Sequence, residues 1–191
     1  MSIVLPVFNE ADSLREFFGE LISAVEPLGF AIEAVFINDG SADDSLAVMR
    51  EIKDEHAGRV DVMVLDFARN FGHQAAVTAG IEHTSGDVVL IMDTDMQDDP
   101  AAIPAMVDKW RAGAEVVFAT RTSRREPALV RFLFNAYYGV FSSITPIEIP
   151  HSAGNFGLID RRVVEEIRRL PEHNRYYPGL RAGIGFRQAG V

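Results

Sequence analysis

"DVVLIMDTDMQDDP", residues 87–100, joins an apolar run to a cluster of four aspartates and a glutamine. The run 87–92 has the length and residue types of a buried strand, and Pro100 after Asp99 is typical of a first helical position behind its cap. A buried strand that leads through a turn into a helix is the repeating unit of parallel α/β sheets. The acidic segment is either a solvated turn or a place where something positive binds.

The alternation of strand and helix extends along the chain on both sides of this segment. Apolar runs predict strands at 2–7, 31–38, 60–66, 87–92 and 114–119, and helical spacing predicts helices at 10–26 and 72–83. Ser41, with Asp44 three residues later, is typical of a cap that begins a further helix. We therefore predict an α/β fold with a mostly parallel sheet and helices on both faces.

Composition limits the classes of function. At 191 residues the chain is long enough for one sizeable core, and it has no cysteine for a disulfide, a thiolate metal site or a thiol nucleophile. The net charge of -10 argues against nucleic acid as a partner. No run reaches the ~18 apolar residues that span a bilayer, and residues 2–7 do not form a signal peptide.

The charge is unevenly distributed. Residues 1–120 hold 7 Lys/Arg and 22 Asp/Glu, whereas residues 121–191 hold 11 Arg and 6 Asp/Glu, which gives net charges of -15 and +5. A basic final third suggests a phosphate-bearing or anionic surface as its partner, although a scatter of solvated arginines is the alternative.

Three predicted strand ends carry polar chemistry: "PVFNE" at 6–10, "NDGS" at 38–41 and "MDTD" at 92–95. In parallel α/β sheets, ligands bind outside the carboxyl ends of the strands. Asp93 and Asp95 stand two apart, so in an extended chain their carboxylates point to the same side, and Gln97 continues the alternation. Such oxygens suit Mg²⁺ or Mn²⁺, while we interpret Asp98 and Asp99 as turn and cap residues.

The order of the motifs adds a family resemblance. With "LPVFNE" at 5–10, "INDGSADDS" at 37–45, "ARNFGHQAAVTAGI" at 68–81 and "DTDMQDDP" at 93–100, the chain resembles the family 2 glycosyltransferases. The likeness is greatest to the polyprenyl-phosphate sugar transferases, which include dolichol-phosphate mannose synthases and bacterial undecaprenyl-phosphate glucosyltransferases. It covers essentially all 191 residues. It implies one catalytic domain with the Rossmann-like GT-A fold, in which 1–120 binds the nucleotide sugar and 121–191 faces the acceptor and the membrane.

The resemblance also implies roles for single residues. Those expected to line the nucleotide-sugar site are Pro6, Phe8, Asn9, Glu10, Asp39 and Asp93, with Glu10 and Asp39 near the base and ribose. Those expected to act on the leaving group are Asp93, Asp95 and Arg121, with Asp95 and Gln97 as ligands of Mg²⁺ or Mn²⁺. Arg121 and Arg131 are expected to hold the acceptor phosphate.

Two motif residues have open interpretations. His73 lies either near a phosphate or, as we favour, in a structural position, and Arg69 anchors either a diphosphate or a neighbouring carboxylate. The small residues that follow predict that a helix packs closely on the sheet: Gly72, Ala75, Ala76, Ala79 and Gly80.

The final third raises the question of the acceptor. Residues 121–144 begin basic and become aromatic, which suits a helix on a bilayer interface or an ordinary core helix; the resemblance favours the membrane. In the family pattern, an aspartate often stands where this chain has Asn155, and an asparagine is no general base. That is tolerable if the acceptor is a lipid phosphate, which is already anionic. We interpret the helical arginines at 161, 162, 168 and 169 as a mostly solvated face.

The sequence therefore predicts an inverting, metal-dependent transfer of a hexose from a UDP- or GDP-sugar to polyprenyl phosphate. The resemblance implies a domain that precedes transmembrane helices, works at the cytoplasmic face of the membrane and can associate with further copies. The alternatives are a family 2 enzyme acting on a saccharide hydroxyl and a silent nucleotide-sugar-binding module.

Overall fold

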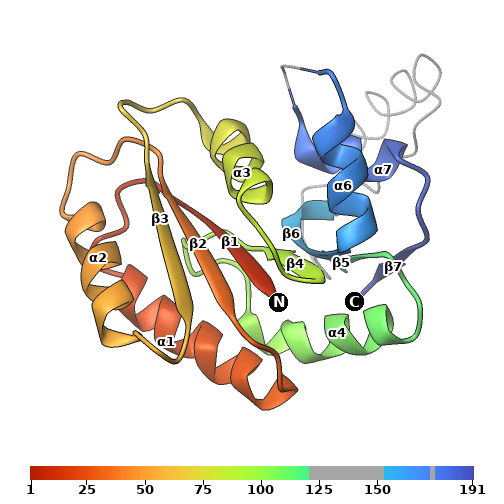
Figure 1. The fold of residues 1–191 in the computed structure, drawn as a ribbon, viewed down its shortest axis with the longest axis horizontal. Helices are drawn as coiled ribbons and strands as arrows, with labels where there is room; N and C mark the ends of the chain where they lie inside the picture. Colours follow the sequence, from red (N-terminus) through yellow and green to blue (C-terminus); the bar gives the residue numbers. More distant parts are fainter. Residues whose placement is uncertain (121–152, 173–174) are drawn as a thin grey trace, which may run out of the picture.

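A computed structural model describes residues 1–120, 153–172 and 175–191. Its described strands form one seven-stranded sheet in the order β3-β2-β1-β4-β6-β5-β7 (Figure 1). The strands are β1 (Ser2–Val7), β2 (Glu33–Asn38), β3 (Asp61–Asp66), β4 (Val88–Ile91), β5 (Val116–Thr120), β6 (Ala153–Asp160) and β7 (Gln188–Gly190). The α-helices are α1 (Leu14–Val25), α2 (Ser45–Glu55), α3 (His73–Glu82), α4 (Ile103–Arg111), α6 (Arg161–Arg169) and α7 (Tyr177–Gly183), and the 3-10 turns are η1 (Glu26–Leu28) and η2 (Pro100–Ala102).

The sheet is mostly parallel, as predicted. β1 pairs in parallel with β2 and β4, β2 with β3, and β5 with β7. In the described part of the chain only β6 runs against its neighbours, β4 and β5. The beginning of β6 therefore lies at the same edge of the sheet as the carboxyl ends of β1, β2, β4 and β5.

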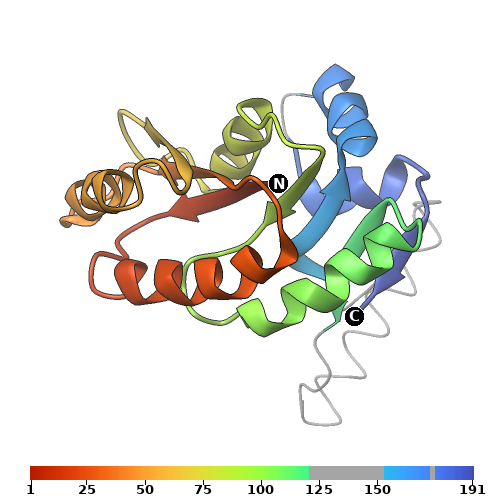
Figure 2. The same cartoon turned by 60° about the horizontal axis from the view of Figure 1, so that its bottom comes forward.

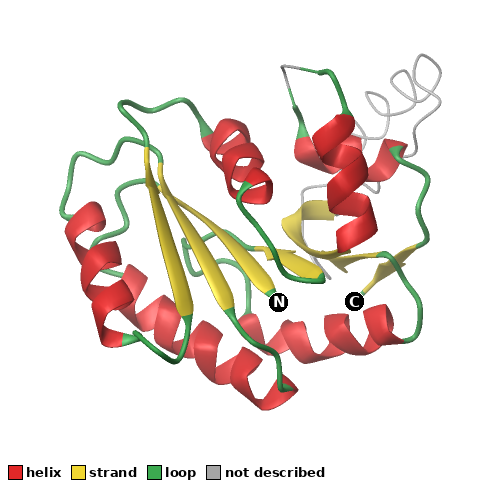
Figure 3. Cartoon of the chain, in the orientation of Figure 1, coloured by secondary structure: helices red, strands yellow, loops and turns green. Residues whose placement is uncertain are grey.

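Helices cover both faces of the sheet (Figures 1 and 3). One buried cluster joins α1, α2 and α4 to the sheet, and α1 and α4 lie side by side across it (Figure 2). A second buried cluster joins α3, α6 and α7 to the opposite face. Among the described helices, none has the length and apolarity that crossing a bilayer requires.

The first two helices begin later than predicted. α1 begins at Leu14 rather than at residue 10, because the carbonyl of Glu10 accepts from the N–H groups of Ser13 and Leu14 in a preceding turn. α2 has its N-cap at Asp44, not at Ser41. The hydroxyl of Ser41 instead accepts from the N–H of Asn9, 3.0 Å away. Ser41 therefore links the loop before α2 to the loop after β1.

α3 packs closely on the sheet at Ala76 and Gly80, in agreement with its small residues. A Cβ at Gly80 would lie 2.3 Å from Val4 Cγ1 and 2.8 Å from Ile37 Cδ1. The helix axis is thus held at a distance that only glycine allows at this position.

Gly80→Ala should therefore destabilise the protein, by about 1–3 kcal/mol, because the added methyl forces neighbouring core side chains to move. Gly19→Ala is the matched control, since Gly19 lies inside α1 with no atom within 4 Å of a Cβ there. It should stabilise the helix by about 0.5–1 kcal/mol. Urea unfolding measures both changes, and equal midpoints for the two variants would contradict the close packing of α3.

Candidate active site

The candidate site lies at the carboxyl ends of three adjacent strands, β2, β1 and β4. Pro6 belongs to β1, Asp39 follows β2, and the acidic segment 93–97 follows β4. The buried hydroxyl of Thr94 donates to the carbonyl of Pro6 at 3.1 Å and so ties the acidic segment to the end of β1. The three polar strand ends predicted from the sequence are therefore neighbours.

The acidic segment does not stay extended, and the prediction that Gln97 continues the alternation of Asp93 and Asp95 is wrong. Residues 94–96 form a bend, in which Met96 has φ 60°. Asp95 is exposed, and its Oδ1 accepts from the N–H of Gln97 at 3.1 Å. Asp99 caps η2 as expected, since its carboxylate accepts from the N–H of Ala101.

Asp39 organises the loop that precedes α3. This carboxylate is 3% exposed and accepts from the N–H groups of Phe71 at 2.7 Å and Gly72 at 3.0 Å. Gly40, with φ 68°, lets the loop approach, because a Cβ there would lie 2.4 Å from the carbonyl carbon of Arg69. Both oxygens of Asp39 are thus engaged by the protein itself.

Asn9 and Glu10 join the end of β1 to the loop before α2. Asn9 has φ 57°, a conformation that asparagine tolerates better than most residues, and its Oδ1 accepts from the N–H of Ala42 at 2.8 Å. The N–H of Glu10 donates to Ser45 Oγ at 2.9 Å, while its carboxylate accepts from Ser13 Oγ. Phe8, before them, is about half exposed.

His73 lies at the candidate site, in contact with Asp93, a contact that the sequence did not predict. Its Nε2 lies 2.5 Å from Asp93 Oδ1. The hydrogen bond to Asp93 raises the pKa of His73 above the ordinary 6.5, burial opposes the rise, and the charges of Asp93, Asp39 and Asp95 add to it. The available signal was its position, directly after the glycine that caps α3.

Gln74 extends this polar contact toward the other half of the sheet. Its Oε1 accepts from the N–H of Tyr177 at 2.8 Å, and its Nε2 lies 3.4 Å from Asn155 Oδ1 and 3.4 Å from His73 Nδ1. One residue of α3 thereby joins the acidic segment to the beginning of β6 and to α7. Nothing in the periodicity of the sequence singled it out.

The carboxylates fit a hard divalent cation only as a partial ligand set. Across residues 1–120, 153–172 and 175–191, no group of three or more His, Cys, Asp or Glu side chains is placed to hold a metal ion. Mg²⁺ and Mn²⁺ commonly take one or two carboxylates and complete their shell with water and substrate phosphates. The exposed Asp95 has the chemistry for such a site.

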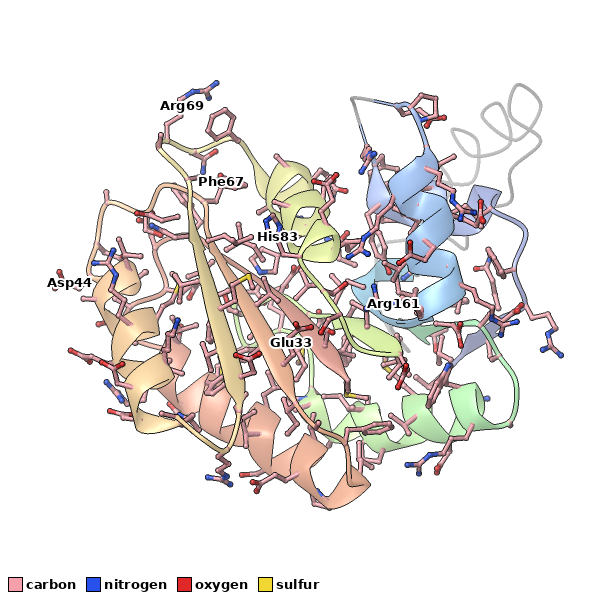
Figure 4. The ribbon with its side chains drawn as sticks, in the orientation of Figure 1. Glu33, Asp44, Phe67, Arg69, His83 and Arg161 are labelled. Atoms are coloured by element: carbon pink, nitrogen blue, oxygen red, sulfur yellow. The ribbon has the colours of Figure 1, made fainter. Side chains whose placement is uncertain are left out.

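Two of the four helical arginines, Arg161 and Arg168, turn largely inward, contrary to the interpretation of a mostly solvated face, with 22% and 26% of their side chains accessible. Arg161 donates to the carbonyls of Gly86 and Thr84, and Arg168 donates to those of Ile81 and Glu82 at the end of α3 and of Thr84 just after it. Figure 4 shows Arg161 directed from α6 into the space beside α3. Arg162 and Arg169 do form an exposed face, with 66% and 71% of their side chains accessible.

Arg69 contacts its own loop rather than a carboxylate. Its guanidinium donates to the carbonyl of Asn70 and lies 4.0 Å above the ring of Phe71, and Figure 4 shows it reaching outward. The predicted helix at 121–144, with Arg121 and Arg131, lies outside the described residues.

The arrangement of the strands and helices defines the fold of the protein. The fold matches that of GT-A glycosyltransferases: a mannosyltransferase from Pyrobaculum calidifontis, solved with GDP-Man and Mn²⁺, superposes with a TM-score of 0.69 at 18% identity over 100% of this chain and 54% of that one. TarS of S. aureus, solved with UDP-GlcNAc, superposes with a TM-score of 0.59 at 14% identity over 100% of this chain and 55% of that one.

The chain belongs to glycosyl transferase family 2, whose model matches residues 2–168. An uncharacterised glycosyltransferase of Synechocystis sp. is 39% identical, over 100% of this chain and 59% of the relative. A bactoprenol glucosyl transferase of Shigella phage SfX is 36% identical, over 97% of this chain and 60% of the relative. The chain thus spans about three fifths of the length of these relatives, and its likeness to polyprenyl-phosphate sugar transferases is confirmed.

The His73–Asp93 contact makes a prediction about titration. Because the folded pKa is raised, the pair stabilises the folded state fully below the unfolded pKa near 6.5, and this contribution is lost as pH rises through the folded pKa. An NMR titration of the imidazole should give a midpoint above 6.5 in the wild-type chain and a lower one in Asp93→Asn.

Proposed function

We propose that this chain is the single catalytic domain of an inverting glycosyltransferase, which moves a hexose from a UDP- or GDP-sugar to polyprenyl phosphate. The observation that carries the proposal is the convergence of Asp39, Asp93 and Asp95 at the carboxyl edge of a GT-A sheet. Residues 1–120 bind the donor, and residues 121–191 face the acceptor and the membrane.

The donor is held between the ends of β1, β2 and β4. Pro6, Phe8, Asn9 and Glu10 line the nucleotide site, and Asp39 lies near the base and ribose while it holds the loop 67–72 in place. His73 orients Asp93 toward the nucleotide. One structural neighbour was solved with GDP-Man and another with UDP-GlcNAc. These two complexes support a nucleotide sugar as the donor, but they do not decide between uracil and guanine as its base.

Asp95 and Gln97 are the proposed ligands of Mg²⁺ or Mn²⁺. When bound, the cation neutralises the charge that develops on the departing diphosphate. The Pyrobaculum mannosyltransferase, which was solved in complex with Mn²⁺, supports a divalent cation of this kind. The carboxylate of Asp95 is available for it, because only the N–H of Gln97 is hydrogen-bonded to it among the described residues.

The transfer itself needs no general base. An acceptor phosphate oxygen forms the new bond to the anomeric carbon of the sugar, while the bond from that carbon to the nucleoside diphosphate breaks and the electron pair leaves with the diphosphate. Asn155, which stands at the acceptor end of β6 and contacts Gln74, cannot remove a proton. A phosphate monoester, with a second pKa of about 6, is already a nucleophile at neutral pH.

This favours polyprenyl phosphate over a saccharide hydroxyl, and the bactoprenol glucosyl transferases among the relatives support the same acceptor. The enzyme would then work at the cytoplasmic face of the membrane, where Arg121 and Arg131 hold the acceptor phosphate and the basic final third lies against anionic lipid. Further copies of the chain can associate there. A silent nucleotide-sugar-binding module is the second candidate, and it predicts binding without turnover.

Calorimetric titration of UDP and GDP in the presence of Mn²⁺ should give binding of one nucleotide that EDTA abolishes. Asp95→Ala should weaken that binding by at least about tenfold, because a metal ligand is lost. Asp54→Ala removes an equally exposed carboxylate from the far end of α2 and should change nothing. Nucleotide binding that is unchanged by EDTA and by Asp95→Ala would contradict the proposal that Asp95 is a metal ligand.

Turnover with a labelled donor should require the phosphate of the acceptor. Polyprenyl phosphate should be glycosylated and the matched polyprenol should not, since the alcohol has a proton that Asn155 cannot take. The rate should fall as pH drops below about 6, where the acceptor monoester gains a proton. Equal rates with the alcohol would point to the enzyme that acts on a saccharide hydroxyl. If the chain binds the nucleotide but gives no turnover, the result would point to the silent nucleotide-sugar-binding module.

A further inference from the structure

α7 carries an arginine that is buried without a counter-charge. Arg181 is 1% exposed, and its Nη2 donates to the carbonyl of Gly154 at 3.3 Å. Among the described residues, its Nε and Nη1 have no hydrogen-bond partner and no carboxylate pairs with it; burial raises the pKa of the nearby Tyr177 hydroxyl, and the charge of Arg181 opposes that rise. The rings of Phe118 and Tyr177 lie 5.4 Å from the guanidinium carbon.

This arrangement is costly to the folded state. A guanidinium stays protonated in proteins, so burial cannot neutralise it. Removing such a charge from water is unfavourable, and contacts with aromatic rings recover only part of that loss. A fold that keeps Arg181 in this position is therefore less stable than one with an apolar side chain there.

The other inward-facing arginines of this half of the sheet are treated differently. Arg161 and Arg168 lie against the carbonyls around Thr84, which accept several of their N–H groups. Arg175 pairs with Glu82 at 3.0 Å. The lack of a carboxylate partner for Arg181 among the described residues is thus a local feature, since Arg168, whose Nε is also without a hydrogen-bond partner, pairs with Glu165 at 3.0 Å.

The backbone makes room for the charge beneath the candidate active site. A Cβ at Gly157 of β6 would lie 2.8 Å from Arg181 Nη1 and 2.8 Å from the carbonyl oxygen of Val117, so glycine is required there both by the guanidinium and by the backbone of β5. Gly157 pairs with Ile91, two residues before Asp93 on the chain, and with Phe118 of β5. Gly154 and Asn155, at the beginning of β6, lie at the same edge as the acidic segment.

We propose that Arg181 supplies a buried positive charge to the phosphate group of a substrate, and that this phosphate is its missing counter-charge. The inference rests on the proposed function and adds a residue to its electrostatics. In a low-dielectric interior the attraction acts over several ångströms without direct contact and is little screened by salt. The phosphate belongs either to the departing diphosphate of the donor or to the monoester of the acceptor.

The test is Arg181→Met, which keeps a long side chain and removes the charge. It should raise the Tm of the ligand-free chain by roughly 2–4 °C, because an uncompensated charge is lost from the interior. It should at the same time weaken the binding of a phosphate ligand by about tenfold. Arg187→Met is the matched control, since that side chain is 73% exposed and should alter neither quantity.

Two titrations identify the source of the phosphate: UDP or GDP with Mn²⁺, and farnesyl phosphate without nucleotide. Weaker binding in one arm assigns Arg181 to that substrate. A variant that is less stable, fails to fold, or binds both ligands as tightly as wild type would show a purely structural arginine and overturn the proposal. If the wild-type chain binds neither ligand, the proposed function fails first.

Gly157→Ala tests the position of the Arg181 guanidinium without removing its charge. Its methyl group would lie 2.8 Å from both Nη1 and the Val117 carbonyl oxygen, so it should weaken the same titration arm as Arg181→Met and also lower the stability of the β5–β6 pairing. Gly154→Ala is its control, because the nearest atom to a Cβ there is the Phe156 nitrogen at 4.0 Å. Weakening by Gly154→Ala but not by Gly157→Ala would contradict the assignment.

Discussion

The site depends on one buried carboxylate. Asp39 stands at the end of β2 and accepts two backbone N–H groups of the loop before α3. These bonds place Gly72, which caps α3, and therefore also His73, which follows it and contacts Asp93. Because an unpaired buried N–H or carboxylate costs several kcal/mol in total, loop and strand end hold each other in one arrangement.

That arrangement is transmitted across the sheet by α3. The helix is held against β1 and β2 by the missing side chain of Gly80, and its Gln74 contacts Asn155 and Tyr177 on the far side of β4. The part of the sheet proposed to bind the donor and the part proposed to face the acceptor thus meet on a single helix. The close packing of α3 on the sheet therefore fixes where the polar side chains at the beginning of this helix lie.

Charge is distributed in the same two halves. The carboxyl ends of β2 and β4 carry aspartates, whereas α6 and α7 bring arginines, of which most are satisfied by carbonyl oxygens or carboxylates. Within the described chain Arg181 has no carboxylate partner and leaves two nitrogens without a hydrogen bond, and it lies under the edge where phosphate groups are proposed to bind. Stability is given up at that position, as is common where a protein prepares a site for a charged ligand.

The sequence by itself determined the α/β class, the parallel strands and the three polar strand ends, because apolar periodicity and strand-end chemistry are local properties. It also identified the order of motifs that marks the family. Only the tertiary structure decided that Met96 bends the acidic segment, that His73 contacts Asp93, that Gln74 joins two halves of the sheet, and that Arg161 and Arg168 turn inward. Each of these depends on contacts between residues twenty or more positions apart or on a backbone angle that no periodicity records. Local pattern therefore fixed which groups lie at the edge, and packing fixed which of them touch.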